Sequence, residues 1–547
     1  MRALDYISNA RPELKGAAFA LYPLSYYITG ILNYSQTGKN VILGFFTFTT
    51  LFYWRKILAA RFNIDPAIIL ILAIIAANIA FQATVRDVFG VQQDDIVVIQ
   101  SIFSTNLGES TEFFVQYWRY IAVHFGILLL FCLSYWACFI RQYNRDFKSS
   151  SDISKFTWLA VASFTLILVA IHFNPALRRG NPLYYFPYYY TKWQAELANA
   201  EALQKILANT TNDPALATMH LSNNTDKNTL VLVIGESDTR HNWSLYGYKR
   251  KTNPELEKLK DDLLVFNNIK SADASTIGSI TKIFTPATQK APGLWKTEPG
   301  IVTIAKHLGY KVIWITNQGT RNTGIVSILA SQADEVIFTN AGGSRSEGSH
   351  DEVVMKPYDQ ALADTAEKKF IVVHILGAHP AYNFRYPESH AIFEGLNDDV
   401  SNELARNGRS IWAIEFRNYY DSAIHYEDYV LSSLLKRLME KKGTNTSFLY
   451  LADHGEDVAH HTDFSGHNHR VKEMWEIPFI FWSSNLNHQS KTLRNNIANR
   501  SYNADVVDHT ILGLLNIEGD YYQPELDIFS NRFESTITLS KKNDRKP

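Results

Sequence analysis

Three short apolar runs beyond residue 228 each end in side chains that can bind a metal ion or a phosphate. The acidic and imidazole groups that follow these runs are Glu236, His379, Asp453 and His454. Carboxylate and imidazole together suit a borderline cation such as Zn²⁺. Taken singly, such an acid is commonly a helix cap, and a histidine inside a strand is commonly a core residue. Groups of this kind at the ends of three successive strands together favour a metal site.

The adjacent pair Asp453 and His454 is the strongest of these signals. Gly455 follows the pair and permits a tight turn, so that both side chains can reach one ion. Further histidines follow closely in the chain at His460, His461, His467 and His469. This density of imidazole groups adds to the expectation of a bound cation.

A transfer reaction at such a site needs a nucleophile, and cysteine is not available because both cysteines lie in the apolar N-terminal part. A hydroxyl beside a metal can serve instead, since coordination lowers its pKa. Residues 271–281 are rich in hydroxyls and begin a predicted helix, whose N-terminus also attracts phosphate. Composition leaves Ser275, Thr276 and Ser279 open, with ordinary helix capping as the alternative.

Strand-like and helix-like segments alternate from residue 229 onward. The expected strands are residues 229–235, 263–269, 311–316, 335–338, 370–376, 447–452 and 478–482. The expected helices include residues 302–308 and 422–440. This alternation predicts an α/β domain with a central, largely parallel sheet. Functional groups in such sheets gather at the carboxyl ends of the strands, which is where the groups described above lie.

The composition excludes several classes of protein. The chain has 547 residues, which predicts at least two domains, and 53 Lys and Arg against 54 Asp and Glu. Binding to nucleic acid is not expected, because neutralising phosphates requires a basic excess. Two cysteines exclude a disulfide scaffold and a cysteine-rich metal site.

The first 180 residues are much more apolar than the rest and predict a transmembrane domain with five helices. The long uncharged stretches are residues 16–38, 66–85, 120–140 and 156–177, and a shorter stretch covers residues 41–54. Each long stretch can cross about 30 Å of hydrocarbon as a helix. Lys39 and Arg55 flank the short stretch and can snorkel to the interface.

Lys and Arg gather in the N-terminal tail and after the second and fourth spans, which places these segments in the cytoplasm and everything beyond residue 178 outside. Residues 86–117 are too polar to span, and predict either an amphipathic helix on the outer leaflet or a plain loop. Residues 181–228 predict an aromatic interfacial segment, a helix and a linker. The expected domains are therefore 1–180, 181–228 and 229–547.

Several specific motifs identify a family that the chain resembles. They are Val233-Ile-Gly-Glu236-Ser, Leu245-Tyr-Gly-Tyr-Lys-Arg-Lys-Thr-Asn-Pro254, Trp314-Ile-Thr-Asn-Gln318, His374-Ile-Leu-Gly-Ala-His379 with Arg385-Tyr-Pro387, and Asp453-His-Gly-Glu456. With these motifs the chain resembles the bacterial phosphoethanolamine transferases, inner-membrane enzymes of the alkaline phosphatase/sulfatase superfamily. The resemblance extends over nearly the whole chain.

The resemblance implies a threonine nucleophile, which the family's register places at Thr276. It implies Glu236, Asp453 and His454 as zinc ligands, with Thr276 completing the set around one Zn²⁺. A second zinc ion is compatible with the family.

Two further histidines are implied as substrate-binding residues. His379 matches a residue that binds phosphoethanolamine or a second zinc. His467 is the best match by spacing to a further site histidine, and His469 is the alternative.

The implied reaction transfers phosphoethanolamine from phosphatidylethanolamine to lipopolysaccharide. Thr276, ionised by zinc, attacks the phosphorus, diacylglycerol leaves, and a hydroxyl or phosphate of the acceptor then attacks the phosphoethanolamine-threonine intermediate. The spans would present both membrane lipids to a catalytic domain in the periplasm, at the inner membrane of a Gram-negative cell.

Departures from the family pattern bear on the acceptor. Members that modify lipid A often carry disulfides, with cysteines flanking the nucleophile, whereas those flanks are Ala272 and Lys282 here. The segment from Trp314 to Gln318 looks more like members that act on the heptose core. Core heptose is therefore favoured, and lipid A is retained as an alternative acceptor.

The alternatives to a phosphoethanolamine transferase are a sulfatase, a phosphoglycerol transferase and a non-catalytic membrane sensor. A sulfatase needs a Cys/Ser-x-Pro-x-Arg sequence, which the chain lacks. A phosphoglycerol transferase that uses phosphatidylglycerol would share the threonine and the metal. A non-catalytic membrane sensor with a degenerate enzyme domain is the third alternative, and the intact set of expected site residues argues against it.

Overall fold

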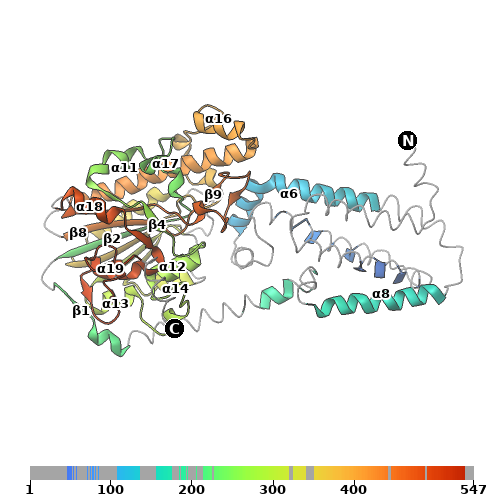
Figure 1. The fold of residues 1–547 in the computed structure, drawn as a ribbon, viewed down its shortest axis with the longest axis horizontal. Coiled ribbons are helices and arrows are strands. Elements are labelled where there is room, and N and C mark those ends of the chain that lie inside the picture. The colour runs from blue at the N-terminus through green and yellow to red at the C-terminus, as the bar shows by residue number, and fades with distance from the viewer. Residues whose placement is uncertain are drawn as a thin grey trace. The chain divides into compact units, whose positions relative to one another are not determined.

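The computed structural model describes residues 213–223, 227–318, 325–340, 350–441, 445–486 and 489–535, the segments 107–135 and 155–174, and single residues or short runs within 46–84 and 181–205. The chain divides into two compact units (Figure 1). One comprises Met1–Asp87, Val91–Phe103 and Tyr117–Ala195, and the other comprises Val88–Gly90, Ser104–Gln116 and Glu196–Pro547.

Two long helices are described in the N-terminal part, α6 (Leu107–Tyr135) and α8 (Lys155–Phe173). Among the described residues, α8 is the one helix that is long and apolar enough to cross a membrane, and it matches the span expected at residues 156–177. Its exposed side chains include Phe156, Leu159 and Leu166, which suits a surface facing lipid.

The other expected spans are described less fully. Helix α6 overlaps the span expected at residues 120–140 and extends back to Leu107, with non-helical dihedrals at Tyr117. Part of the polar segment 86–117 is therefore helical. The expected span at residues 16–38 lies outside the described residues, as do half of the positions of the span at 41–54 and most positions of the span at 66–85.

The second unit is built on a seven-stranded sheet in the order β3-β11-β8-β2-β7-β5-β6. The strands are β3 (Leu264–Val265), β11 (Phe479–Ser483), β8 (Asn445–Ala452), β2 (Asn228–Gly235), β7 (Lys368–His374), β5 (Lys311–Thr316) and β6 (Glu335–Phe338). The five strands from β8 to β6 are parallel, and β11 and β3 continue the sheet antiparallel. The prediction of a largely parallel sheet is confirmed.

Helices cover both faces of this sheet (Figure 1). One face carries α12 (Thr276–Phe284), α13 (Ile301–His307), α14 (Ile325–Ala330) and α19 (Val507–Leu514), and the other carries α11 (Pro254–Lys258), α15 (Met355–Ala363) and α17 (Ile411–Met439). Helix α18 (Lys491–Ala498) adds Ile497 and Ala498 to the cluster on the first face, and α16 (Asp399–Arg406) packs against the start of α17.

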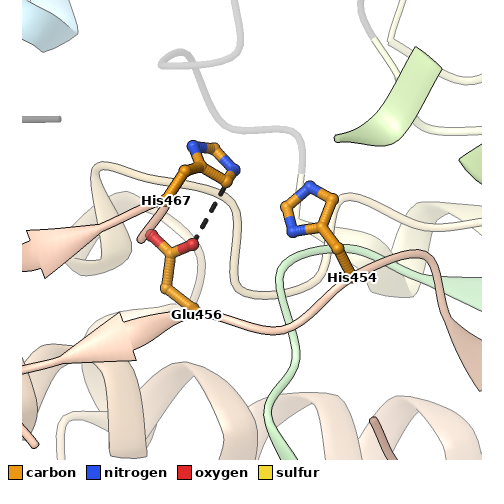
Figure 2. Close-up of side chains that lie close together, drawn as sticks. All are labelled: His454, Glu456 and His467. Atoms are coloured by element: carbon orange, nitrogen blue, oxygen red, sulfur yellow. Dashed lines mark ion pairs between the residues drawn. The ribbon is translucent and has the colours of Figure 1, made fainter. Parts of the chain in front are cut away.

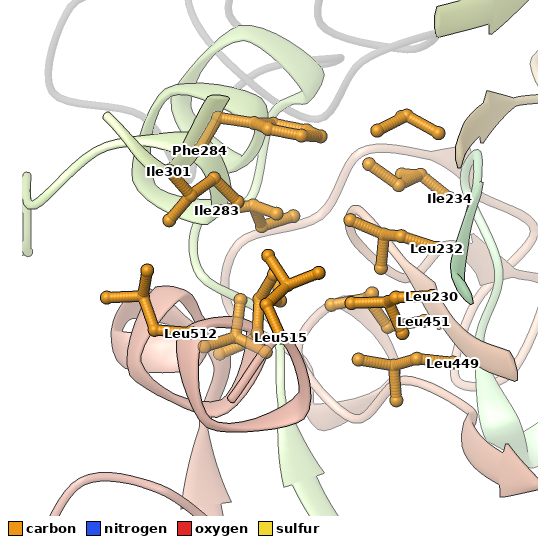
Figure 3. Packing of buried hydrophobic residues seen from close by; sticks show 14 of the residues in the cluster. Leu230, Leu232, Ile234, Ile283, Phe284, Ile301, Leu449, Leu451, Leu512 and Leu515 are labelled. Atoms are coloured by element: carbon orange, nitrogen blue, oxygen red, sulfur yellow. The ribbon is translucent and has the colours of Figure 1, made fainter. Parts of the chain in front are cut away.

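Strand β2 lies at the centre of the sheet and is buried along its whole length. Leu230, Leu232 and Ile234 point into one apolar cluster with α12, α13 and α19, as Figure 3 shows. Val231 and Val233 point into the other cluster, which includes residues of α17. This alternation explains the continuous apolar run before Glu236, since a central parallel strand is buried on both faces.

Two expectations about elements are corrected. The strand expected at residues 263–269 is two strands, because after β3 the chain leaves the main sheet and β4 (Asn268–Lys270) pairs with β12 (Ser501–Asn503). The stretch expected to be a linker contains β1 (His220–Leu221), which pairs with β13 (Ile517–Glu518). The remaining short strands are β9 (Asp457–Val458) and β10 (Ser465–Gly466).

Candidate metal centre and nucleophile

The carboxyl ends of β2 and β8 bring the first site residues together. The two strands pair in parallel with Gly235 opposite Ala452, and the amide of Asp453 donates to the carbonyl of Gly235 at 3.0 Å. Glu236 and Asp453 therefore leave the sheet side by side. The amide of Ser237 donates to Oδ1 of Asp453 at 3.1 Å, which fixes that carboxylate against the neighbouring strand end.

The loop after β7 holds Glu236 from the other side. The amide of Ala378 donates to the carbonyl of Glu236 at 3.0 Å. Gly377 has a φ of +51°, and a Cβ there would lie 2.9 Å from both the backbone N and the backbone O of Glu236. The left-handed dihedral favours a glycine at position 377, and the close approach to the backbone of Glu236 leaves no room for a Cβ.

The helix α12 presents Thr276 to the same place. Ser275 is the N-cap of α12, and its hydroxyl accepts from the amide of Gly278. Ser279 is also engaged locally, because its hydroxyl donates to the carbonyl of Asp273 at 3.1 Å. Of the three hydroxyls that composition left open, Thr276 is the one that reaches the carboxyl ends of the strands.

The Thr276 hydroxyl lies between a carboxylate and an imidazole. Its Oγ1 is 3.0 Å from Oε1 of Glu236, to which it donates, and 3.4 Å from Nε2 of His454. An ion pair between Lys282 of α12 and Asp273 links this helix to the segment that precedes it.

The ligand atoms of Glu236, Asp453 and His454 all lie within 4.8 Å of one another and are buried. Nε2 of His454 is 3.5 Å from Oε1 of Glu236 and 3.4 Å from Oδ2 of Asp453. Nδ1 of His454 donates to the carbonyl of Gly455 at 2.9 Å, which directs Nε2 toward the two carboxylates. Oδ2 of Asp453 is buried and has no hydrogen-bond partner.

The buried negative charge of this cluster favours a bound cation. Burial, with the nearby charge of Glu236, raises the pKa of Asp453 to about 8. Burial by itself would lower the pKa of His454, but Asp453 and Glu236 outweigh it and raise that pKa to about 10. Two buried carboxylates are costly without positive charge between them. The donor set fits a zinc ion, as does the Oδ2 atom of Asp453, which accepts no hydrogen bond.

A second group of potential ligands shares His454 with the first (Figure 2). It consists of His454, Glu456 and His467, whose ligand atoms also lie within 4.8 Å of one another. Nε2 of His467 is 3.7 Å from Oε2 of Glu456, and Oε1 of Glu456 accepts from the hydroxyl of Tyr382 at 2.7 Å. Burial, followed by the charge of His454, lowers the pKa of His467 to about 3, so its imidazole is neutral, as a metal ligand must be.

Sequence reasoning did not select Glu456, although the Asp453-His-Gly-Glu456 motif contains it. A signal was available, since Glu456 lies two residues after His454 in the loop that follows β8. Gln318 was also overlooked. Its side-chain amide donates to Oε2 of Glu236 at 3.3 Å and to the carbonyl of Ile375 at 2.9 Å. Gln318 follows β5, so a third strand end contributes to the orientation of Glu236.

Two more of the predicted histidines are not members of the two ligand groups. His379 is in the loop after β7, where its carbonyl accepts from Nε of Arg385 at 3.1 Å, and it belongs to neither ligand group. The carbonyl of His469 accepts from the Trp475 indole, and His469 likewise belongs to neither group. Between the two alternatives for the further histidine, the geometry brings His467 to His454, with ring centroids 4.6 Å apart.

This chain is similar to known proteins in its sequence and in its fold. The sulfatase family model matches residues 228–517. Phosphoethanolamine transferase EptC of Escherichia coli (strain K12) is 32% identical over 472 residues, which cover 80% of this chain and 78% of that protein. Phosphoethanolamine transferase CptA of Salmonella typhimurium is 32% identical over 471 residues, with the same shares covered.

Solved structures agree with this relationship. The crystal structure of the C-terminal periplasmic domain of Escherichia coli EptC, in complex with zinc, is 34% identical, with a TM-score of 0.55, and covers 59% of this chain and 92% of that one. The integral membrane protein EptA from Neisseria meningitidis, a lipooligosaccharide phosphoethanolamine transferase, shares the fold over 94% of this chain and 97% of its own, with a TM-score of 0.63 at 19% identity. The chain therefore belongs to the sulfatase family and, within it, to the bacterial phosphoethanolamine transferases of the alkaline phosphatase superfamily.

Proposed function

We propose that this protein transfers phosphoethanolamine from phosphatidylethanolamine to lipopolysaccharide through a covalent intermediate on Thr276. The observation that carries the proposal is the position of Oγ1 of Thr276, 3.0 Å from Glu236 and 3.4 Å from His454, at the N-terminus of α12. Membership in the phosphoethanolamine transferases supports the transferred group, and the hydroxyl's place among buried, charged side chains supports its role.

A zinc ion would be held by Glu236, Asp453 and His454 with the oxygen of Thr276. When bound, it lowers the pKa of a coordinated hydroxyl and stabilises negative charge on phosphoryl oxygens. The second ligand group, which includes Glu456 and His467, supports a further site for zinc or for the phosphoethanolamine group. The zinc complex of the EptC periplasmic domain supports this choice of metal.

In the first displacement, Oγ1 of Thr276 attacks the phosphorus of phosphatidylethanolamine. Glu236 accepts the hydrogen bond of Oγ1 and is placed to take its proton. The Oγ1–P bond forms, the bond from phosphorus to the diacylglycerol oxygen breaks, and the proton ends on the diacylglycerol hydroxyl. The N-terminus of α12 stabilises the negative phosphoryl oxygens through its backbone amides.

In the second displacement, an oxygen of the acceptor attacks the phosphothreonine-type intermediate. The new O–P bond forms, the bond from phosphorus to Oγ1 breaks, and the acceptor's proton returns to Thr276. His379 and His467 are the residues proposed to bind the phosphoethanolamine group. Core heptose is the favoured acceptor, on the resemblance of the segment from Trp314 to Gln318, and lipid A is the alternative.

The proposed location is the inner membrane of a Gram-negative cell, with several spans and the catalytic domain in the periplasm. The full-length likeness to an integral membrane relative supports this arrangement. Both substrates would then be membrane lipids, and no nucleic acid would be involved.

The test is headgroup release from phosphatidylethanolamine by purified full-length variants. Thr276→Ala should stay folded, still bind zinc, and show no release, whereas Thr276→Ser should keep partial activity because zinc can ionise either alcohol. Thr281→Ala is the matched control, since Thr281 lies on the same helix but its hydroxyl donates to the carbonyl of Ile277 at 2.7 Å. Full activity in Thr276→Ala would refute the proposed nucleophile.

Two further measurements decide the donor and the acceptor. Mass spectrometry of Thr276 after exposure to each lipid separates a phosphoethanolamine adduct from the phosphoglycerol adduct of the alternative transferase. Deleting the gene should remove phosphoethanolamine from core sugars. It should not change how much phosphoethanolamine the lipid A phosphates carry. Loss from lipid A alone would contradict the favoured acceptor while leaving the enzyme class intact.

A further inference from the structure

We call the compact unit that contains both ligand groups the catalytic unit. A cavity of about 440 Å³ lies in this unit, among residues outside both ligand groups. Its wall is formed by the segment that follows β2, by α16, by α17 and by the loop after β9. The basic side chains on this wall are Arg240, His241, Lys249, Arg417 and His460. The motif from Leu245 to Pro254, which the metal centre does not use, supplies part of the wall.

Two of the three permanent cations on this wall are paired with carboxylates. Nη2 of Arg240 is 2.6 Å from Oε2 of Glu476, and Nζ of Lys249 is 2.5 Å from Oε2 of Glu403. Arg417 is different, because no carboxylate among the described residues lies within ion-pair distance of it. It is only 4% exposed. A buried guanidinium without a counter-charge is costly, and an anion in the cavity would offset that cost.

The Arg417 guanidinium is also held in place. Its Nε donates to the carbonyl of Val458 at 2.6 Å, and its Nη1 lies 3.4 Å from the Tyr248 hydroxyl. Its Nη2 is buried and has no hydrogen-bond partner. A fixed guanidinium with an unused donor on a cavity wall is preorganised for an oxyanion, and phosphate is the anion that arginine binds most specifically.

The cavity shares two chain segments with the metal centre. Arg240 and His241 follow Glu236 in η4 (Arg240–Asn242), and His460 follows Glu456 after β9. The wall is therefore positioned by the same strand ends that position the metal ligands. A ligand in the cavity would lie beside the segments that carry the reaction.

We propose that this cavity is a second, metal-independent anion site, in which Arg417 binds a phosphate group carried by the glycolipid acceptor and Lys249 contributes from the rim. The identity of the acceptor rests on the proposed function, whereas the phosphate site itself rests on the geometry of the cavity. The site would hold the acceptor by a phosphate that does not react, so it acts in binding and not in the chemical step.

The first experiment measures equilibrium binding of inorganic phosphate to the zinc-loaded, full-length protein in detergent. Wild-type protein should show a phosphate site that Arg417→Gln loses or weakens at least tenfold. Arg409→Gln is the matched control, since Arg409 donates to the adjacent carbonyl of Ala459 at 3.3 Å but does not line the cavity. Equal phosphate binding by wild type and Arg417→Gln would overturn the proposal.

A surface variant protects the test against misfolding of Arg417→Gln. Lys249→Glu reverses a charge at the rim, where the side chain is 65% exposed, and should also weaken phosphate binding. Lys251→Glu, at a side chain that is 77% exposed and outside the cavity, should not. Identical phosphate affinities in these two variants would contradict a site at this cavity.

The second experiment separates the sources of the phosphate. Lys249→Glu and Arg417→Gln should raise the KM for lipopolysaccharide at least fivefold, without changing kcat or headgroup release to water. Chemically dephosphorylated lipopolysaccharide should raise the wild-type KM in the same way and leave the variants unaffected. A rise in the KM for phosphatidylethanolamine instead would assign the cavity to the donor and refute the proposal.

The two proposals can fail separately. If the wild-type enzyme releases no headgroup from phosphatidylethanolamine, the proposed function fails, and phosphate binding still reports on the cavity. If headgroup release is normal but the cavity variants bind phosphate like wild type, the cavity proposal alone fails.

Discussion

At the scale of single residues, Glu236 is oriented from both of its carboxylate oxygens. Oε1 accepts from the hydroxyls of Thr276 and Ser237, and Oε2 accepts from the amide of Gln318. Each partner restricts one rotation of a side chain that is only 1% exposed. Groups that orient a metal ligand in this way commonly change metal affinity when removed.

We therefore expect Gln318→Ala to weaken zinc binding by roughly 10- to 100-fold while the fold is retained. The physical reason is that Oε2 of Glu236 loses its hydrogen bond and the carboxylate gains freedom. Competition with a chelator of known affinity measures the effect on the full-length protein. Gln332→Ala, at a half-buried position after α14, is the control, and equal zinc affinities of the two variants would contradict the orienting role.

A buried acid on α17 supplies a pH-dependent test. Asp428 accepts from the amides of Glu255 and Leu256 at 2.7 and 2.9 Å, which caps the start of α11. Burial nevertheless raises the pKa of Asp428 to about 7, from an ordinary value of about 4. Between these values the folded state binds more protons than the unfolded state, so this group's contribution to stability falls as pH rises through the window.

Asp428→Asn should remove that slope, so the difference in unfolding free energy between wild type and variant should shift in favour of the variant as pH rises from about 4 to 7. Denaturant unfolding of the full-length proteins at several pH values measures it. Asp399→Asn, in the exposed first turn of α16, should leave the slope as in wild type. A slope that persists in Asp428→Asn would assign it to another group.

At the scale of elements, the loop after β7 acts as a spacer that sets the position of Glu236, the residue that follows β2. Gly377 achieves this by lying where any Cβ would meet the backbone of Glu236. The left-handed dihedral at position 377 costs an ordinary residue about 1 kcal/mol, and the steric contact adds to that cost. Displacement of Glu236 would then disturb the ligand group directly.

Gly377→Ala should lose zinc binding and turnover, beyond a modest loss of stability. Gly408→Ala is a matched control, because Gly408 also has a positive φ, +76°, but a Cβ added there would have no atom within 4 Å. Both variants should be destabilised by about 1 kcal/mol from the dihedral alone. Zinc content and melting temperature distinguish them, and normal zinc content in Gly377→Ala would refute the spacer role.

Strands were easier to predict from the sequence than the long helix or the edge strands. The apolar runs of β5 and β6 coincide with the expected residues, because their burial leaves a continuous pattern. Helix α17 begins at Ile411, well before residue 422, because its early turns bury polar residues such as Asn418 and Asp421, which bond Arg250. That network hides the apolar period of the helix. The partner of β4 lies far along the chain and leaves no local signal.

At the scale of the whole molecule, one boundary between the catalytic unit and the N-terminal unit falls within the residues of helix α6. Residues Ser104–Gln116 belong to the catalytic unit, and the other unit resumes at Tyr117, where α6 departs from helical dihedrals. The sequence predicted a polar segment followed by a span in this region. The predicted orientation of the spans depends on the distribution of Lys and Arg, which no contact within the chain tests.

A reporter that is active only in the periplasm tests that orientation. Fused after Asn209, it should be active, and fused at Ser150 it should be silent, because the positive-inside rule places these positions on opposite sides of the membrane. A reporter that is active in the cytoplasm should give the reverse pattern. Periplasmic activity at Ser150 would overturn the five-span prediction.

The pairing of β2 with β8 has a consequence for the newly made chain. Asp453 follows its bonding partner Ser237 by 216 residues, so the ligand group is complete only after both strands have been synthesised and aligned. A slip of one residue would turn every side chain of a strand to the opposite face and separate Gly235 from Ala452. Capture of a metal ion by this group would therefore be a late event in folding, because it would require that the sheet has closed in its native alignment.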